Sequence, residues 1–126
     1  MSLQQQLGQG GLRIRRVSET GAAVDDQWLE RSFVLMSDQL VHPWPVVALD
    51  TISAAHVDEW IALQPEVVLL GTGPRQGFLA PRLQAQLMAR GIGIECMDNG
   101  AAARTFNLLA DEDRRVLVVL LFASGD

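Results

Sequence analysis

The strongest constraint on the fold is an alternation of short apolar runs with helical segments in the second half of the chain. Residues 66–70 and 116–122 are apolar runs of strand length, typical of strands covered on both faces, and residues 92–97 suit a further strand in which apolar residues alternate. Between them, apolar side chains recur at helical spacing; Pro81 suits the first turn of one helix, and Ser53 can cap the helix before the first run. This order of strands and helices predicts a parallel βαβ arrangement with right-handed crossovers.

The first half of the chain predicts shorter, antiparallel elements. Residues 12–17 suit a short strand, and residues 28–36 suit one longer strand that a turn at 37–39 would reverse into a hairpin. Together the two halves predict an α/β fold. The predicted fold is a single three-layer domain over residues 12–126, with a mixed central sheet and antiparallel N-terminal hairpin strands at the edge of that sheet. Residues 1–11, rich in Gln and Gly, are expected to be a flexible tail.

Composition argues against several classes of function. All ten basic residues are Arg, and the net charge of −5 lacks the basic surplus with which nucleic-acid-binding proteins neutralise phosphates. No apolar stretch approaches the ~20 residues that span a bilayer, and the first residues do not resemble a secretory signal. We therefore expect a cytoplasmic protein with no membrane span and no nucleic-acid partner.

The chain shows no local set of catalytic or metal-binding residues. Cys96, the one cysteine, alternates with Ile92 and Ile94 in a predicted strand and is expected to be buried and chemically inert. The two histidines, His42 and His56, share no local motif with it and supply no metal-ligand spacing. The expectation is no catalytic residue, no metal and no cofactor.

The loop 71–77 follows a predicted strand and contains three glycines, which let backbone N–H groups approach an anion. The third glycine comes one residue too late for a dinucleotide fingerprint, and no lysine follows, as a P-loop would require. Within the loop, Arg75 could clamp a carboxylate or phosphate, or it could form an ion pair with Asp98. Both interpretations remain open at this point.

The turn 98–100 precedes the last predicted helix. Its Asp and Asn can cap that helix, which explains the residues fully; alternatively they form a polar cluster with side chains of the first helical turns. Because parallel strands release their following loops at the same end of a sheet, this turn and the loop 71–77 are expected to lie close together. The candidate ligand-binding residues are Thr72, Gly73, Arg75, Asp98, Asn99, Arg104 and Asn107.

Four segments resemble a known family: LVHPWPV (40–46), VVLLGTGPRQ (67–76), RGIGIECMDNGAAARTFNLL (90–109) and RRVLVVLLF (114–122). The family is a bacterial and archaeal domain of unknown function. It also forms a mitochondrial complex I assembly factor and an adipogenesis-associated protein with an Mth938-type domain. The resemblance implies a three-layer α/β fold with a mixed sheet, and an assembly or interaction role.

Two positions depart from that family. The resemblance implies that many relatives carry Cys where this chain has Ala103 and Tyr where it has Phe106. The resemblance thus implies either that the thiol and hydroxyl are structural in the family, or that this chain has lost their chemistry.

Three functional hypotheses follow. The first is a protein-interaction or assembly module, acting on respiratory-complex maturation through an unidentified protein partner, as a monomer or weak homodimer. The second is a binding domain for a small anion, built on the loop 71–77 and the cap 98–100. The third, an enzyme, has the least support. An exposed apolar patch near Trp44 or on the last helix would favour the first hypothesis.

Overall fold

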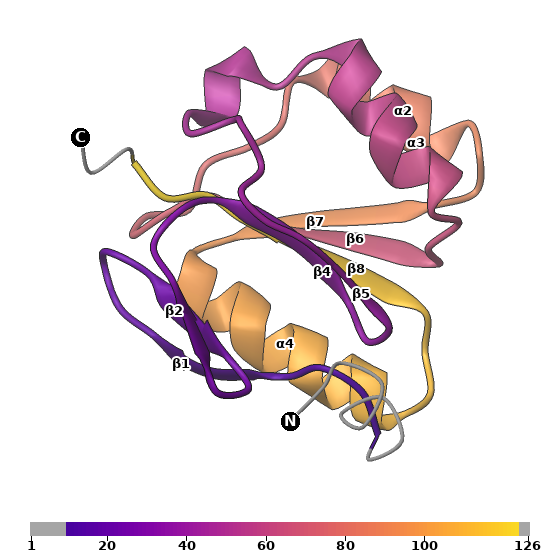
Figure 1. Ribbon diagram of the computed structural model, residues 1–126. Helices are drawn as coiled ribbons and strands as arrows, with labels where there is room; N and C mark the ends of the chain where they lie inside the picture. Colours follow the sequence, from indigo (N-terminus) through magenta and orange to yellow (C-terminus); the bar gives the residue numbers. More distant parts are fainter. Residues whose placement is uncertain (1–9, 124–126) are drawn as a thin grey trace.

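The computed structural model describes residues 10–123 and arranges them in three layers (Figure 1). The middle layer is a five-stranded sheet with strand order β5-β4-β8-β6-β7. In this sheet β6 runs parallel to β7 and β8, whereas β4 runs antiparallel to β5 and β8, which confirms the predicted mixed sheet. Its strands are β4 (Phe33–Met36), β5 (Gln39–Val41), β6 (Val67–Gly71), β7 (Gly93–Met97) and β8 (Val116–Leu120).

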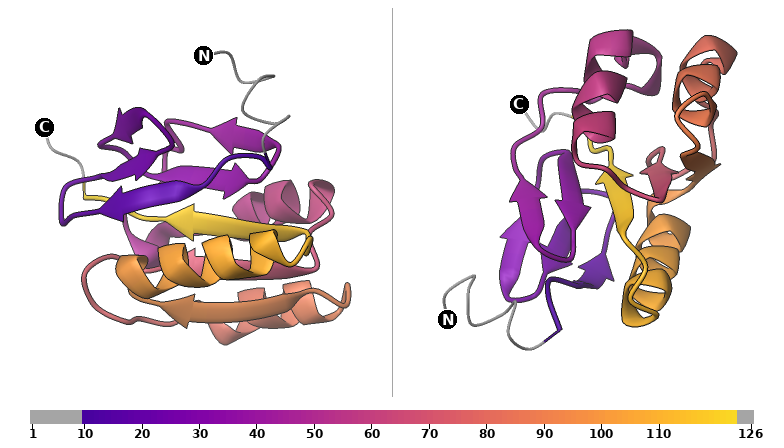
Figure 2. Two further views of the ribbon diagram at one scale, coloured as in Figure 1. Left: turned by 90° about the horizontal axis from the view of Figure 1, so that it is seen from below. Right: turned by 90° about the vertical axis from the view of Figure 1, so that its right-hand side faces the viewer.

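Helices cover both faces of this sheet (Figure 2). The 3₁₀ turn η1 (Leu49–Thr51), α2 (Ala54–Ala62) and α3 (Pro81–Met88) lie on one face, and α4 (Asn99–Asp111) lies on the other. As predicted, Ser53 caps α2, and its hydroxyl accepts the backbone N–H of His56 at 3.3 Å. Among the described residues, no helix has the length and apolar character needed to cross a bilayer.

The first strands form a separate sheet, which corrects the prediction that they extend an edge of the central one. β1 (Ile14–Val17), β2 (Ala22–Val24) and β3 (Gln27–Leu29) make a three-stranded antiparallel sheet on the α4 side. The edge hairpin of the central sheet is formed by β4 and β5 alone, on the predicted turn.

The single strand expected over 28–36 is also wrong, because the chain divides it between β3 and β4. At the break, the fully buried Ser32 turns its polar groups to other segments. Its hydroxyl accepts the N–H of Phe122 at 2.9 Å, and its carbonyl accepts the N–H of Trp44 at 2.8 Å. The apolar alternation continues through the break, because Leu29 and Phe33 contribute to the same core from two different sheets. The sequence pattern therefore does not reveal the break.

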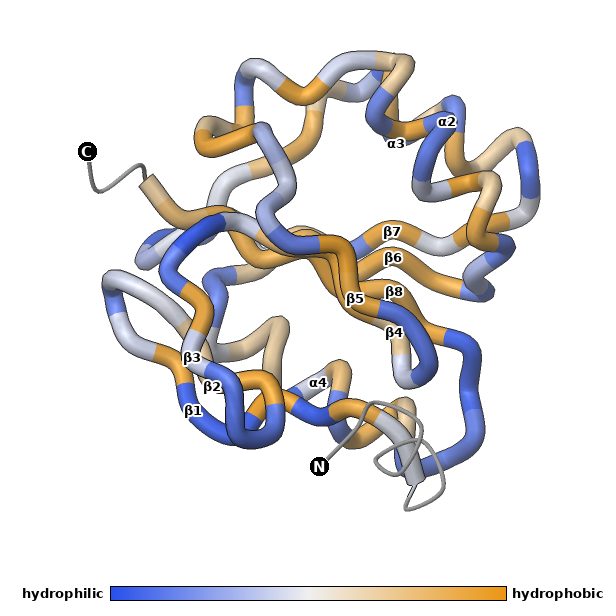
Figure 3. Tube along the Cα trace, in the orientation of Figure 1, coloured by the Kyte–Doolittle hydropathy of each residue, from blue (hydrophilic) through white to orange (hydrophobic). Residues whose placement is uncertain are grey.

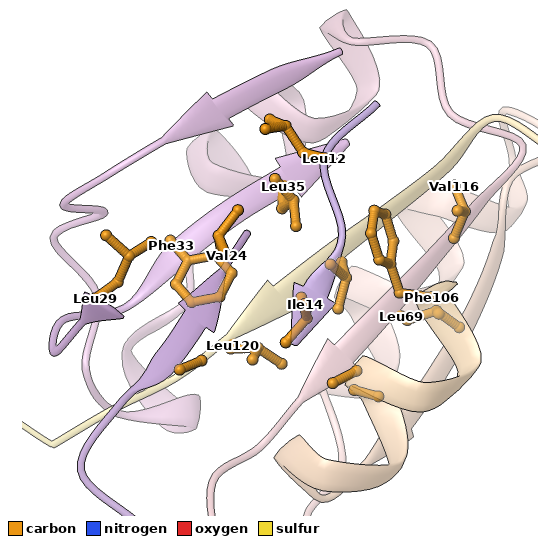
Figure 4. Close-up of a cluster of buried hydrophobic side chains, with 14 of the residues drawn as sticks. Leu12, Ile14, Val24, Leu29, Phe33, Leu35, Leu69, Phe106, Val116 and Leu120 are labelled. Carbon is orange, nitrogen blue, oxygen red and sulfur yellow. The ribbon is translucent and has the colours of Figure 1, made fainter. Parts of the chain in front are cut away.

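The central sheet separates two apolar cores, and its strands are the most continuously hydrophobic part of the trace (Figure 3). Figure 4 shows the core on the α4 side, where Ile14, Phe33, Phe106 and Leu120 meet between the two sheets and the helix. β8 is buried along its whole length between the two cores. The flexible tail expected over residues 1–11 falls, apart from Gly10 and Gly11, outside the described residues.

Candidate functional site

The loops that follow β6 and β7 meet at one end of the sheet, as predicted from their parallel order. The N–H of Thr72 donates to the carbonyl of Met97 at 2.9 Å, and the N–H of Asn99 donates to the carbonyl of Gly73 at 2.8 Å. Two backbone hydrogen bonds therefore join the loop 71–77 to the end of β7 and to the start of α4, and the predicted site residues Thr72, Gly73, Asp98 and Asn99 lie together.

Asn99 is the centre of this junction and is 5% exposed. Its Oδ1 accepts the N–H of Gly73 at 3.0 Å, and its Nδ2 donates to the carbonyl of Leu121 at 2.9 Å. The amide lies so close to Gly71 that a Cβ built there would come within 2.5 Å of Oδ1. Asn99 thus joins three segments of backbone and has both polar atoms of its side chain engaged.

Thr72 closes the loop on itself. Its hydroxyl donates to the carbonyl of Arg75 at 2.6 Å and accepts the N–H of Gly77 at 2.8 Å. Gln76, which sequence reasoning missed, donates from Nε2 to the carbonyl of Cys96 at 2.9 Å. No local pattern marks this contact, because its partner is the backbone of an edge strand rather than a side chain. The loop is held by its own polar groups, and these are not presented to a ligand.

The expected ion pair between Arg75 and Asp98 is absent from the part of the chain that the structure describes. Arg75 is exposed, whereas Asp98 caps α4 by accepting the N–H of Ala101 on Oδ1 at 2.8 Å. The cap interpretation of the turn 98–100 is therefore confirmed. Capping turns the carboxylate of Asp98 back toward the helix, so Arg75 stays in solvent.

Two shallow hollows flank Gly100 and separate the remaining candidates. The first, of about 340 Å³, contains the carboxylates of Glu19 and Asp98 but no cationic side chain, so its charge disfavours an anion. The second, of about 210 Å³, lies between β1 and α4 and includes Arg104, whose Nη1 would come within 3.3 Å of a Cβ built on Gly100. The residues of this second hollow are Ile14, Arg15, Arg16, Val17, Gly100, Ala103, Arg104 and Asn107.

Asn107 supports β1 through both polar atoms of its side chain. Oδ1 accepts the N–H of Ile14 and Nδ2 donates to its carbonyl. The two positions at which family relatives were expected to differ lie nearby on α4: Ala103 is 4% exposed and Phe106 is fully buried in the core. Of the predicted candidates, Arg75 and Arg104 have exposed side chains with no hydrogen-bond partner or ion pair among the described residues.

Cys96 lies close to this end of the sheet but is half-buried, which corrects the expectation of full burial. β7 is an edge strand, so the loop before α3 covers its thiol only in part. The N–H of Leu79 donates to Sγ at 3.4 Å. Burial raises the pKa of the Cys96 thiol, against a smaller lowering by that N–H, so the thiol form is favoured. The described residues contain no group of three or more His, Cys, Asp or Glu side chains that could hold a metal ion.

These features define a class: a three-layer α/β domain whose mixed sheet ends in loops locked by backbone and amide hydrogen bonds. The chain belongs to the family described as "Protein of unknown function (DUF498/DUF598)", whose model matches residues 14–121.

Solved structures share this fold. The NMR structure of a Xanthomonas campestris protein is 44% identical, with a TM-score of 0.84, and the match covers 91% of this chain and 87% of that one. A Bordetella pertussis protein described as an Mth938-like domain is 29% identical, with a TM-score of 0.78, over 90% of this chain and 89% of that one.

Among curated proteins, the chain is similar to a Danio rerio protein named NADH dehydrogenase (ubiquinone) 1 alpha subcomplex assembly factor 3. The two are 35% identical over 80 residues, which is 62% of this chain and 46% of that protein. The chain spans between 46% and 59% of the length of three of the curated relatives that it matches.

Proposed function

We propose that this chain is a protein-interaction domain that assists the assembly of a respiratory complex. The observation that carries the proposal is its similarity to proteins named as complex I assembly factors, in zebrafish and in cattle.

The geometry of the site supports binding by surface contact rather than by enclosure of a small molecule. Asn99 and Thr72 use their polar atoms on backbone groups, and the hollow beside Asp98 has no cation. Trp44 is buried, so the proline-flanked segment presents no aromatic anchor. Large apolar side chains are instead exposed near α3 and on the last helix, where Leu108 is 60% exposed.

Deletion of the gene in its host tests the proposal. We expect less assembled complex I on native gels, a matching loss of NADH-dependent quinone reduction, and restoration of both by the wild-type gene. A deletion strain with a normal amount of assembled complex would contradict the proposal. We also expect the purified chain to be a monomer or a weak homodimer, which sedimentation velocity measures.

A second candidate function is the binding of a small anion beside α4. Its support is the exposed guanidinium of Arg104 next to Gly100, with Arg16 at the same hollow; Arg16 also stacks on Trp28, 5.5 Å from the ring centroid. A titration with inorganic phosphate, followed by amide chemical shifts, tests this candidate. Saturable shifts at 100–104 that disappear in Arg104→Ala would support it, and shifts that persist in that variant would exclude it.

A further inference from the structure

The outward face of α3 is apolar although it faces solvent. Leu83 and Leu87 are buried on the inner face of the helix, at 2% and 0% exposure. The opposite face carries Pro81, Ala85 and Met88, which follow one another at intervals of about one helical turn. All three are exposed. Met88 is 65% exposed. An amphipathic surface helix normally places polar side chains at these positions, so this face has the composition of a contact surface.

A hollow opens at the N-terminal end of this helix. It has a volume of about 360 Å³ and apolar walls from Leu49, Ile52 and Leu83, with Asp50 and Arg82 at its edge. Phe78 borders it and is 68% exposed. Phe78 and Met88 are the two most exposed of the large apolar side chains in the described part of the chain, and they mark the two ends of α3.

The charged side chains of α3 and of its flanking segments are arginines, although Asp50 of η1 borders the hollow and Asp58 of α2 accepts a hydrogen bond from Gln86. Residues 67–94 contain three arginines and no Asp or Glu, in a chain whose net charge is −5. Arg82 lies in the first turn of α3 and Arg90 just beyond its end, and the ion pairs of the described residues involve neither of them. A partner that covers the apolar strip therefore meets positive charge at both ends of the helix.

From these observations we propose that the α3 face docks an amphipathic helix of a partner protein. The α3 face consists of Phe78, Pro81, Ala85 and Met88, with Arg82 and Arg90 at its ends. The partner helix carries an apolar stripe flanked by acidic residues. This inference rests on the proposed function and names the surface that performs it. A second copy of the chain is a poorer occupant, because antiparallel α3 helices would bring Arg82 of one copy against Arg90 of the other.

A pair of designed peptides tests the chemistry. The first is a synthetic helix with leucines at i, i+3, i+4 and i+7 and glutamates on both flanks; the second has lysines in place of the glutamates. We expect the glutamate peptide to shift the amide resonances of 78–90 and to bind at least ~10-fold more tightly than the lysine peptide. Arg82→Glu combined with Arg90→Glu should reverse that preference. Equal binding of both peptides, or shifts confined to other elements, would overturn the proposal.

Variants of the face supply the second arm. Phe78→Asp and Met88→Glu change exposed side chains, so their thermal unfolding midpoints should match the wild type. Each should weaken the glutamate peptide ~10-fold or more, whereas the matched control Leu108→Glu, on α4 across the sheet, should leave its binding unchanged. Loss of binding in the control to the same extent would overturn the proposal.

Competing occupants give distinct results. A wild-type dimer in sedimentation that Met88→Glu disperses would reassign the face to self-association. Binding to phosphatidylglycerol vesicles that the same substitution abolishes would reassign it to a lipid surface.

Complementation separates this inference from the proposed function. If a deletion strain loses complex I and the Met88→Glu gene restores it fully, the α3 face is not the docking surface while the assembly role stands. If the deletion has no effect on the complex, the assembly role itself fails.

Discussion

The side-chain amide of Asn107 pairs with both backbone groups of Ile14: Oδ1 accepts the N–H at 3.0 Å, and Nδ2 donates to the carbonyl at 2.7 Å. Asn107 lies in α4 and Ile14 begins β1, 93 residues earlier in the chain. The amide takes the place of a neighbouring strand at the outer edge of the small sheet, where backbone groups would otherwise lack a protein partner. This contact joins the small sheet to the helix layer.

Asn107→Ala should therefore destabilise the protein rather than remove a ligand contact. Two partly buried hydrogen bonds are lost and two backbone groups are left without a partner, so we expect the free energy of unfolding to fall by about 1–3 kcal/mol. Urea denaturation measures this change. Arg104→Ala, an exposed substitution on the same helix, is the control and should change the value by less than about 0.5 kcal/mol. Equal losses in the two variants would refute the structural role of Asn107.

Local patterns in the sequence predicted the elements that depend on neighbouring residues. The apolar run before Gly71 forms β6, and Ser53 and Asp98 cap α2 and α4, because strand burial and capping are properties of a few consecutive residues. The parallel order of strands also predicted correctly that the loops after β6 and β7 meet.

The errors arise where distant residues decide the outcome. The pattern over 28–36 could not show that Ser32 bonds to Phe122, 90 residues away, and so interrupts the strand. Nor could a polar residue in the second half of a helix reveal that Asn107 faces β1 instead of solvent. The exposure of Met88 was also missed, although a helical projection of α3 would have shown an apolar side chain opposite Leu83 and Leu87.

Gly71→Ala tests the tight packing at the end of β6. A Cβ at this position would come within 2.5 Å of Asn99 Oδ1 and 2.6 Å of Leu120 Cδ2, so the buried amide must move. Overpacking of this kind should cost about 1–3 kcal/mol of unfolding free energy in chemical denaturation. Gly93→Ala, in the adjacent strand β7, is the matched control because its Cβ would meet Val67 at an ordinary 3.4 Å. A Gly71→Ala protein as stable as that control would contradict this packing.

Cys96 should react slowly with alkylating reagents in the native protein. Burial raises its thiol pKa, so the fraction of reactive thiolate near pH 7 is lower than in the unfolded chain. We expect the rate of modification by iodoacetamide to rise at a higher pH in the native protein than in the unfolded chain, and to increase when urea unfolds the protein. Mass spectrometry of the modified chain gives the rate. Cys96→Ala should fold, at a cost of about 1 kcal/mol. Native and unfolded rates that agree at pH 7 would show an accessible, ordinary thiol.

His42 should make the fold less stable in mild acid. Its pKa is lowered by burial and, to a smaller extent, by the positive charge of Arg31. Because the folded pKa lies below the unfolded value of about 6.5, the unfolded chain binds the proton first. The contribution of the neutral His42 to the free energy of unfolding is therefore fully present above about pH 6.5, and it is lost as the pH falls from there through the folded pKa.

Proton NMR titration tests this prediction, because it resolves His42 from His56, the one other histidine. Arg31→Gln should raise the pKa of His42 toward its ordinary value and reduce the loss of stability in acid. Arg90→Gln is the control, because Arg90 does not contribute to the lowering of the His42 pKa, and it should leave both the pKa and the acid stability unchanged. A wild-type His42 that titrates at or above its ordinary pKa would contradict the prediction.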